Sequence, residues 1–267
     1  MPSYAVVGAS RGIGLEIAMN PVNVVFALVR DKSNSPHIST LASSHVNVFV
    51  VEADAIDHRA LTAAAAEAAK VTGGSLDVLI YNAAHMDITY LFHSLTDYDN
   101  GDQLDTEITK AFKVNVLGAV HSVNAFLPLL REGATKKVLI MSSEAGDREL
   151  TRQIQFSTMG AYGLTKAALD MVMAKYAVQL KKEGFTIFSV SPGPTDTTDT
   201  ATQTTIAASR PELEELIRQW KEVDPNLDPT LKPVDEIVRK MLKLLASLGP
   251  ADSGTFRPSE EIRAIQI

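Results

Sequence analysis

A tyrosine and a lysine four residues apart form a pair whose types and spacing suggest proton-transfer chemistry. Tyr162 and Lys166 lie in the run YGLTK, within a stretch of helical periodicity over 162–182. Residues four apart share one helix face, so the phenol and the ammonium are expected to be neighbours. A nearby cation favours the phenolate and lowers the phenol pKa, which makes Tyr162 a usable proton donor and acceptor. The same spacing also occurs by chance in many helices.

A glycine-rich turn near the N-terminus suggests phosphate binding. An apolar run over 4–7 leads directly into GASRGIG, and a helical segment follows. Glycines allow close approach to a pyrophosphate, and the helix then presents free N–H groups to it. The spacing G-x-x-x-G-x-G is also compatible with a tight turn alone, but the flanking strand and helix favour a dinucleotide loop. Its expected cofactor-binding residues are Gly8, Ser10, Arg11, Gly12, Ile13 and Gly14.

The same turn also fits the G-x-S-x-G nucleophile turn of α/β-hydrolases. In that fold the turn follows several strands, and an acid and then a histidine come after it in the chain. Here it follows the first strand, and His121 is the last histidine. The hydrolase interpretation is therefore less well supported.

Charge near the second predicted strand bears on the choice of nucleotide. An acid at that place accepts hydrogen bonds from a ribose 2′-hydroxyl, whereas an arginine accommodates a 2′-phosphate. Arg30 follows the run 24–29 and Arg11 lies in the glycine turn, so two guanidiniums favour NADP(H). Asp31 would weaken this preference if it faced the ribose. Both arginines could also be solvated surface residues.

Short β-branched runs alternate with helical stretches along most of the chain. Their near-continuous apolarity is typical of strands buried on both faces of a parallel sheet. We predict an α/β fold with a single Rossmann-type, doubly wound parallel sheet flanked by helices. The predicted strands are 4–7, 24–29, 46–51, 78–81, 137–141 and 186–190, and the plainest helices are 57–71, 106–130 with an interruption at Pro128, and 162–182.

The composition of the sequence changes after residue 191, where Pro, Thr and Asp become frequent. Residues 191–209 carry no strand signal, whereas 211–223 and 233–248 are predicted helices and 254–256 the start of a last strand. No repeat, low-complexity linker or domain boundary is visible. We predict one dinucleotide-binding and catalytic domain over 1–267.

Composition excludes several other classes of protein. A formal charge of −7 argues against nucleic-acid binding, and no apolar run approaches the roughly 18 residues of a membrane span. The chain has no cysteine, and its six histidines fall in no HExxH or HxH spacing, so no metal site is expected. We expect a soluble, cytoplasmic protein without nucleic-acid or membrane partners.

The glycine turn and the Tyr-x-x-x-Lys pair together make the chain resemble the short-chain dehydrogenase/reductase family. Further family marks follow in the expected order over about residues 4 to 200. Ser143, in the run SSEAG, matches the serine that hydrogen-bonds the substrate carbonyl, and register favours it over Ser142. Asn115 looks like the helix asparagine that holds a water against the active-site lysine.

The same resemblance assigns other segments to the cofactor. The run NAA at 82–84 is similar to the family's Asn-Ala-Gly segment, and PGPTDT at 192–197 to the Pro-Gly segment beside the nicotinamide carboxamide. Asp54 corresponds to a residue contacting the adenine. Besides the glycine turn and Arg30, the implied cofactor-binding residues are Asp54, Asn82, Ala83, Tyr162, Lys166, Pro192, Gly193, Thr195 and Thr197.

The resemblance implies hydride transfer from NADPH to the carbonyl of a small hydrophobic or aromatic ketone or aldehyde. Tyr162 would donate the proton, and Ser143 would hold the carbonyl oxygen. Lys166 would lower the tyrosine pKa and bind the nicotinamide ribose, and Asn115 would complete a proton relay. Plainer readings exist: Ser143 could cap a turn, and Asn115 could be a buried amide satisfied by backbone.

Two further functions remain open. Relatives in secondary metabolism perform epimerisation or dehydration, and a nucleotide-sensing protein could keep the fold without catalysis. A pure sensor needs no proton donor. The presence of Ser143, Tyr162, Lys166 and Asn115 therefore favours an enzyme. The stretch 241–256 resembles the C-terminal end of sniffer-like carbonyl reductases.

The chain departs from the family pattern in three places. Val7 replaces the usual threonine before the first glycine, and Pro21 leaves only 13–20 for the first helix, about 12 Å long. We therefore predict a stunted helix that packs less completely under the cofactor. Residues 147–159 lengthen the gap between Ser143 and Tyr162, and either form a loop on the rim of the substrate pocket or a solvated loop.

The resemblance also implies a lid and an oligomer. A C-terminal helical lid is expected over 199–223, including Trp220, with Tyr90, Phe92 and Tyr98 lining the pocket opposite. We expect a homodimer or homotetramer formed through the two long helices. The residues that would form this face, or would be ordinary core, are Met171, Val172, Val178, Phe112, Val116 and Val120.

Overall fold

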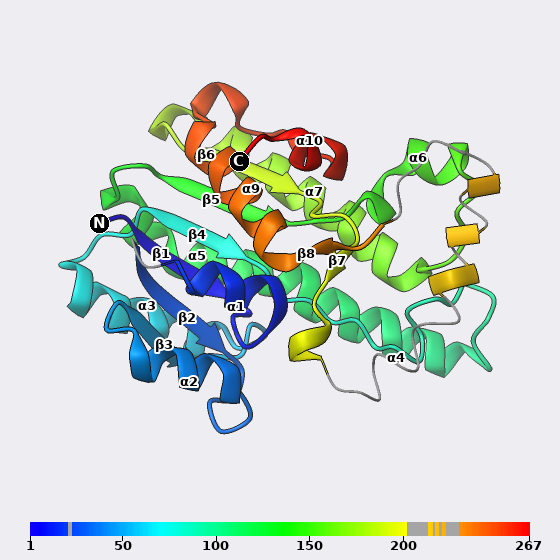
Figure 1. Cartoon of the computed structure of the whole chain (residues 1–267), viewed down its shortest axis with the longest axis horizontal. Coiled ribbons are helices and arrows are strands. Elements are labelled where there is room, and N and C mark those ends of the chain that lie inside the picture. The colour runs from blue at the N-terminus through cyan, green and yellow to red at the C-terminus, as the bar shows by residue number, and fades with distance from the viewer. Residues whose placement is uncertain (21–22, 202–212, 216, 219–220, 223–229) are drawn as a thin grey trace.

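In the computed structural model, seven parallel strands form one sheet in the spatial order β3-β2-β1-β4-β5-β6-β9 (Figure 1). The structure describes residues 1–20, 23–201, 213–215, 217–218, 221–222 and 230–267. The strand order reverses between β1 and β4, and the predicted doubly wound α/β sheet is thereby confirmed. The strands are β1 (Ser3–Val7), β2 (Val24–Val29), β3 (Val48–Glu52), β4 (Val78–Tyr81), β5 (Lys137–Met141), β6 (Thr186–Val190) and β9 (Phe256–Arg257).

Helices cover both faces of the sheet (Figure 1). Successive strand residues point to opposite faces, so Val7 lies in the core shared with α3, α5 and α7, whereas Val6 lies in the core shared with α1, α2, α9 and α10. The helices are α1 (Gly12–Ala18), α2 (Pro36–Ser44), α3 (His58–Thr72), α4 (Gly101–Phe112), α5 (Gly118–Glu132), α6 (Arg148–Gln153), α7 (Gly160–Gln179), α9 (Val234–Ser247) and α10 (Ser259–Ala264).

Local capping decides several boundaries. The Asp57 carboxylate accepts the N–H groups of Arg59 and Ala60 at the start of α3, and Gly73, at a φ of 73°, ends that helix. Strand β3 starts two residues later than predicted because Val46 is 97% exposed and only the residues from 48 onward pair with β2. Helix α2 has no counterpart among the predicted helices because its Ser- and Thr-rich sequence resembles a loop.

The predicted helix over 106–130 is wrong in its start and in its interruption. Helix α4 begins at Gly101, where the Asn100 side chain accepts the Gln103 N–H. A π-helical turn, Lys113–Leu117, joins α4 to α5. Pro128 lies inside α5 without ending it. Pro128 lies on the exposed face of α5. Water can therefore hydrogen-bond the carbonyl four residues earlier, which has no N–H partner at Pro128.

Two predictions in the second half of the chain are also revised, and a third is described only in part. The segment 147–159 is not a plain loop, because Asp147 caps the short helix α6. The Pro- and Thr-rich stretch after residue 191 does contain a strand, since β7 (Thr195–Asp196) pairs with β8 (Lys232–Pro233). Most of the expected lid over 199–223, including Trp220, falls outside the described residues, whereas the seven described residues of the helix predicted over 211–223 are all helical.

Helix α1 is short, as predicted, with seven residues. Ile17 and Ala18 are buried against the sheet, so even this short helix covers part of the core. Its first backbone bond is long, with Leu15 N–H donating to Arg11 O at 3.4 Å between heavy atoms.

We expect the backbone amides of residues 15–20 to exchange hydrogen faster than those in the middle of α3. A seven-residue helix has few internal hydrogen bonds to break before it opens, whereas α3 has fifteen residues and caps at both ends. Hydrogen–deuterium exchange followed by mass spectrometry measures both segments in one sample. Equal protection of the two helices would contradict this prediction.

Candidate active site

Two glycines allow the turn after β5 to lie directly against α7. A Cβ atom at Gly146 would lie 2.5 Å from the Ala167 nitrogen, and one at Gly163 would lie 2.5 Å from the Ala145 oxygen. Any side chain at either position would force the two backbones apart. This close approach places the end of β5 beside the first turns of α7.

The contact brings Ser143 and Tyr162 together. The Ser143 side chain lies beside the Tyr162 phenol, and its oxygen accepts the Ala145 N–H at 3.2 Å. Ser142 is buried instead, beside the Asp170 carboxyl. The turn-capping role considered for Ser143 is therefore present together with its contact to the phenol.

Lys166 lies behind the tyrosine ring. Its Nζ is 5.2 Å from the centroid of the Tyr162 ring and donates a hydrogen bond of 2.7 Å to the Met141 carbonyl. Burial lowers the pKa of Lys166 to about 8, and the nearby Asp170 carboxyl opposes that shift. Burial in turn raises the pKa of the Asp170 carboxyl.

The expectation that Tyr162 has a lowered pKa is wrong for the protein alone. Desolvation raises the pKa of Tyr162 to about 12, and only the neighbouring Ser143 side chain acts in the opposite direction. The ammonium of Lys166 bonds to the strand carbonyl and lies over the ring, so it does not point at the phenol oxygen. Tyr162 therefore holds its proton at neutral pH.

Asn115 lies fully buried in the π-helical turn and ties three segments together. Its Oδ1 accepts the His85 N–H at 2.6 Å, and its Nδ2 donates to the His85 carbonyl at 3.3 Å and to Thr165 Oγ1 at 2.9 Å. Thr165 in turn donates to the Tyr162 carbonyl at 2.7 Å. The hydrogen bonds of the Asn115 side chain are thus satisfied by protein groups. This matches the structural role of a buried amide that was considered for this residue.

The glycine turn is held against the end of β4. Asn82 Nδ2 donates to the Gly8 carbonyl at 2.8 Å, and Gly8, at a φ of 86°, packs on the backbone of Ala83. A Cβ atom at Gly14 would lie 2.1 Å from the Gly8 oxygen, so only glycine fits there. The glycine turn and the Asn82–Ala83 segment therefore form one structural unit, which we call the glycine unit.

The segment after β6 reaches the same unit. Gly193 has a φ of 69°, and Thr195 Oγ1 donates to its carbonyl at 3.1 Å. The Thr197 methyl lies 3.2 Å from where a Cβ of Gly12 would be, and Gly12 N–H donates to Thr200 Oγ1 at 2.9 Å. Residues from both halves of the chain thus meet over the start of α1.

Comparison with known proteins agrees with this arrangement. Residues 3–208 match the family described as short chain dehydrogenase. The chain belongs to the short-chain dehydrogenase/reductase family. This short-chain dehydrogenase/reductase is 39% identical over 260 residues to atnB of Arthrinium sp, covering 95% of this chain and 96% of atnB. It is 44% identical over 206 residues to AacuF of Aspergillus aculeatus, covering 75% of this chain and 77% of AacuF.

Solved structures give the same picture. The NADPH-bound carbonyl reductase from chicken fatty liver superposes with a TM-score of 0.77 at 26% identity, covering 98% of this chain and 97% of that one. The carbonyl reductase Sniffer of D. melanogaster has a TM-score of 0.76 at 20% identity, covering 97% of each chain, which shows the common fold. None of the helices among the described residues is both long and apolar enough to span a bilayer.

The dehydrogenase/reductase family uses NAD(P)(H), and the glycine unit fits such a nucleotide. Helix α1 begins without a side-chain cap, so its N-terminal amides are available to phosphate oxygens. The Gly12 N–H is an exception, because it donates to the Thr200 hydroxyl at 2.9 Å. Asn82, Ala83 and Thr197 therefore contact a glycine turn whose backbone suits a pyrophosphate.

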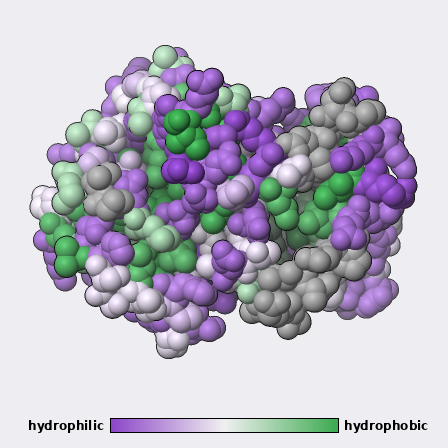
Figure 2. All heavy atoms as spheres, viewed as in Figure 1, coloured by the Kyte–Doolittle hydropathy of each residue, from purple (hydrophilic) through white to green (hydrophobic). Residues whose placement is uncertain are grey.

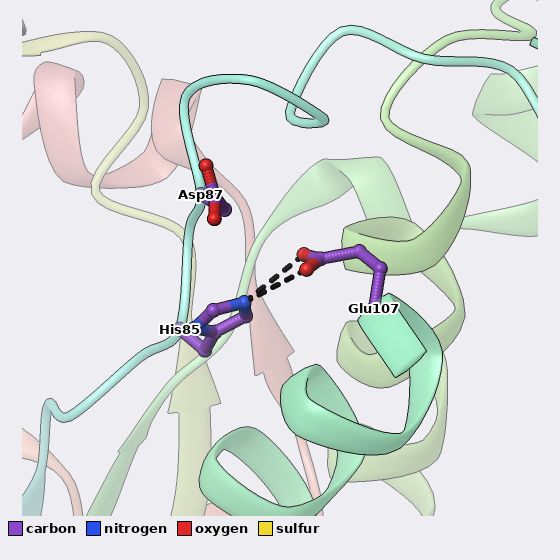
Figure 3. A group of neighbouring side chains, drawn as sticks. All are labelled: His85, Asp87 and Glu107. Carbon is purple, nitrogen blue, oxygen red and sulfur yellow. Dashed lines mark hydrogen bonds and ion pairs between the residues drawn. The ribbon is translucent and has the colours of Figure 1, made fainter. Parts of the chain in front are cut away.

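A second polar group lies next to Asn115 and has no place among the sequence predictions. His85 Nε2 lies 3.1 Å from both oxygens of the buried Glu107 on α4, and Asp87 is close to both (Figure 3). Each side chain offers one metal-ligating atom, and these atoms lie within 4.8 Å of one another. The spacing His-x-Asp with a distant Glu lacks a recognisable motif, because only the tertiary fold brings α4 to the end of β4.

The aromatic residues expected to line the pocket divide between two places. Tyr90 lines an open groove of about 300 Å³ along α4, together with Gln103, Thr106 and Lys110 among others. Tyr98 stacks on Tyr90, with ring centroids 5.7 Å apart. Phe92 instead packs on Ile154 and Phe156, which joins the 147–159 segment to the loop before α4.

We expect the stability of the wild type relative to Lys166→Met to rise with pH. With a folded pKa of about 8 and a free value of 10.5, the unfolded chain binds a proton between these limits that the folded chain has released. The cost of burying Lys166 in the free energy of unfolding is largest below about pH 8. It disappears toward about pH 10.5, a change of about 3 kcal/mol. Urea unfolding of both proteins at neutral and at alkaline pH measures this change. A stability difference independent of pH would contradict it.

Proposed function

We propose that this enzyme is an NADPH-dependent reductase of small hydrophobic or aromatic ketones or aldehydes. The observation that carries the proposal is the position of Ser143 beside the Tyr162 phenol, with the Lys166 Nζ 5.2 Å from the centroid of the tyrosine ring. The bound nicotinamide supplies the hydride. Ser143 then holds the carbonyl oxygen, and Tyr162 donates its proton to that oxygen as the alcohol forms.

The charges around the glycine unit support NADPH as the nucleotide. Arg11 and Arg30 are both exposed, and neither is paired with a carboxylate of a described residue. The Asp31 carboxylate accepts hydrogen bonds from Ser33 N–H at 2.8 Å and Ser33 Oγ at 2.6 Å. Asp31 is thus bound within its own turn, and both guanidiniums are available to a 2′-phosphate. The chicken carbonyl reductase is named as NADPH-bound.

The surroundings of the site support an apolar substrate. Phe92, Ile154 and Phe156 form a separate apolar cluster between the loop before α4 and the segment that carries α6. Figure 2 shows apolar side chains gathered in a hollow on the side of the molecule where α4 and α6 lie. We infer that this cluster forms part of the substrate-binding wall.

We also propose that two or four copies assemble through α7 and the α4–α5 junction. Met171 and Val178 on α7 are 60% and 77% exposed, and Leu164 lies one further heptad along the same helix face. Phe112 is also exposed. Val116, also expected on this face, is buried and belongs to the core instead. A cytoplasmic location remains a prediction from the sequence.

Replacing Tyr162 by phenylalanine removes the proton donor and keeps the ring. We expect kcat for ketone reduction to fall about 10²- to 10⁴-fold, the usual contribution of a positioned acid. NADPH binding should be unchanged, because the ring still packs on Lys166. Steady-state kinetics on a ketone panel, with nucleotide fluorescence as the binding control, measure both quantities. Unchanged turnover would show that another group delivers the proton.

Fluorescence titration with NADPH and with NADH tests the choice of nucleotide. We expect tighter binding of NADPH, and we expect Arg30→Ala to weaken NADPH about tenfold while leaving NADH unaffected, because one charge-assisted hydrogen bond is lost. Arg131→Ala is the matched control, since Arg131 pairs with Glu183 far from the glycine unit. A preference for NADH would show that Asp31 faces the ribose.

A further inference from the structure

Glu144, the residue after Ser143, joins three parts of the chain that are far apart in sequence. Its Oε2 accepts a hydrogen bond of 2.8 Å from the Ser191 hydroxyl. Its Oε1 accepts the Ser259 N–H at 2.8 Å and the Ser259 hydroxyl at 2.7 Å. One carboxylate therefore links the turn that carries Ser143, the end of β6 and the start of α10.

Ser191 transmits this contact to the segment implied for the nicotinamide. Its oxygen accepts the Gly193 N–H at 3.4 Å, and its own N–H donates to the Arg257 carbonyl at 2.9 Å. Gly193 starts the turn that carries Thr195 and Thr197 to the glycine unit. The position of this turn is thus set from the Glu144 side as well as from β6.

Ser259 holds α10 against the same turn. A Cβ atom at Gly193 would lie 2.7 Å from the Ser259 Cβ, so the Gly193 backbone packs directly on the Ser259 side chain. Helix α10 is itself anchored, because Ile262 is fully buried in the core and Lys240 Nζ donates to the Arg263 carbonyl at 2.9 Å. The C-terminal helix is therefore anchored to the core and contacts the turn through Ser259.

We propose that Glu144 is a positioning residue for hydride transfer, which makes α10 part of the active-site scaffold. The inference rests on the proposed reductase function. Hydride transfer needs the nicotinamide and the carbonyl within a fraction of an ångström of their reactive geometry. Glu144 fixes the segment on the nicotinamide side, through Ser191 and Ser259, relative to Ser143 on the substrate side.

The donors around Glu144 define which substitutions are informative. Alanine leaves three partly buried donors without an acceptor, which loosens both segments. Glutamine keeps one oxygen for both Ser259 donors, and its NH₂ group can donate to Ser191 Oγ, since a hydroxyl also accepts. The contact thus depends on hydrogen bonding, and Glu144→Gln should rescue what Glu144→Ala loses.

The test compares Glu144→Ala, Glu144→Gln and Glu67→Ala, a control at an exposed position on α3. We expect Glu144→Ala to lower kcat about tenfold or more and to raise the Kd for NADPH severalfold. Glu144→Gln should stay within about threefold of wild type in both quantities. The control should match wild type. Ser259→Ala, which keeps the backbone donor, should give a smaller loss than Glu144→Ala.

Hydrogen exchange on the same proteins separates positioning from simple stability. We expect Glu144→Ala to speed exchange in both 191–197 and 259–264 while the central strands remain protected. A lower Tm with unchanged kcat, Kd and exchange in these segments would overturn the proposal. Should Glu144→Ala fail to fold, Ser259→Ala carries the same comparison. If wild type binds no nucleotide, the proposed function fails, and the exchange of the two segments still decides whether Glu144 couples them.

Discussion

The turn after β5 lies directly against the backbone of α7, and the positions of Ser143, Tyr162 and Lys166 depend on that contact. It exists because Gly146 and Gly163 have no side chains. Hydrogen bonds then hold it in register: Lys166 donates to the Met141 carbonyl at the end of β5, and Asn115 donates to Thr165 beside Lys166. A wider separation would leave the same residue types in the chain without the arrangement that can move a proton.

Burying the ionisable groups of this site lowers the stability of the folded chain. Lys166 and Tyr162 are buried away from water. Burial lowers the pKa of the lysine and raises that of the tyrosine, so each side chain is shifted toward its neutral form. Asp170, one turn beyond Lys166, is shifted toward its neutral form as well. The neighbouring dipoles and opposite charges compensate this cost only in part, as is common where a fold keeps ionisable groups ready for chemistry. Stability and function therefore oppose each other most directly in the first half of α7.

The two ends of the chain meet at the site. The glycine unit comes from the first strand and helix, whereas β9 and α10 close the far edge of the sheet and contact the Gly193 turn through Ser259. Parallel strands place all their carboxyl ends along one edge, so residues separated by more than a hundred positions can share hydrogen bonds there. Glu144 and Ser259, which are 115 positions apart, are an example.

The sequence by itself determined the doubly wound sheet, the approximate bounds of its strands and the short first helix, because periodicity, glycine turns and Pro21 act locally. It also placed the glycine unit, Ser143, Tyr162 and Lys166 in a family order. Only the tertiary structure decided that Asn115 is satisfied by His85 and Thr165, that Pro128 continues its helix, and that Val116 is core. It also decided that burial raises the Tyr162 pKa, and that Glu144 and the His85–Glu107 pair have partners. Desolvation and long-range hydrogen bonds depend on what packs around a residue, and no local pattern of residues encodes that.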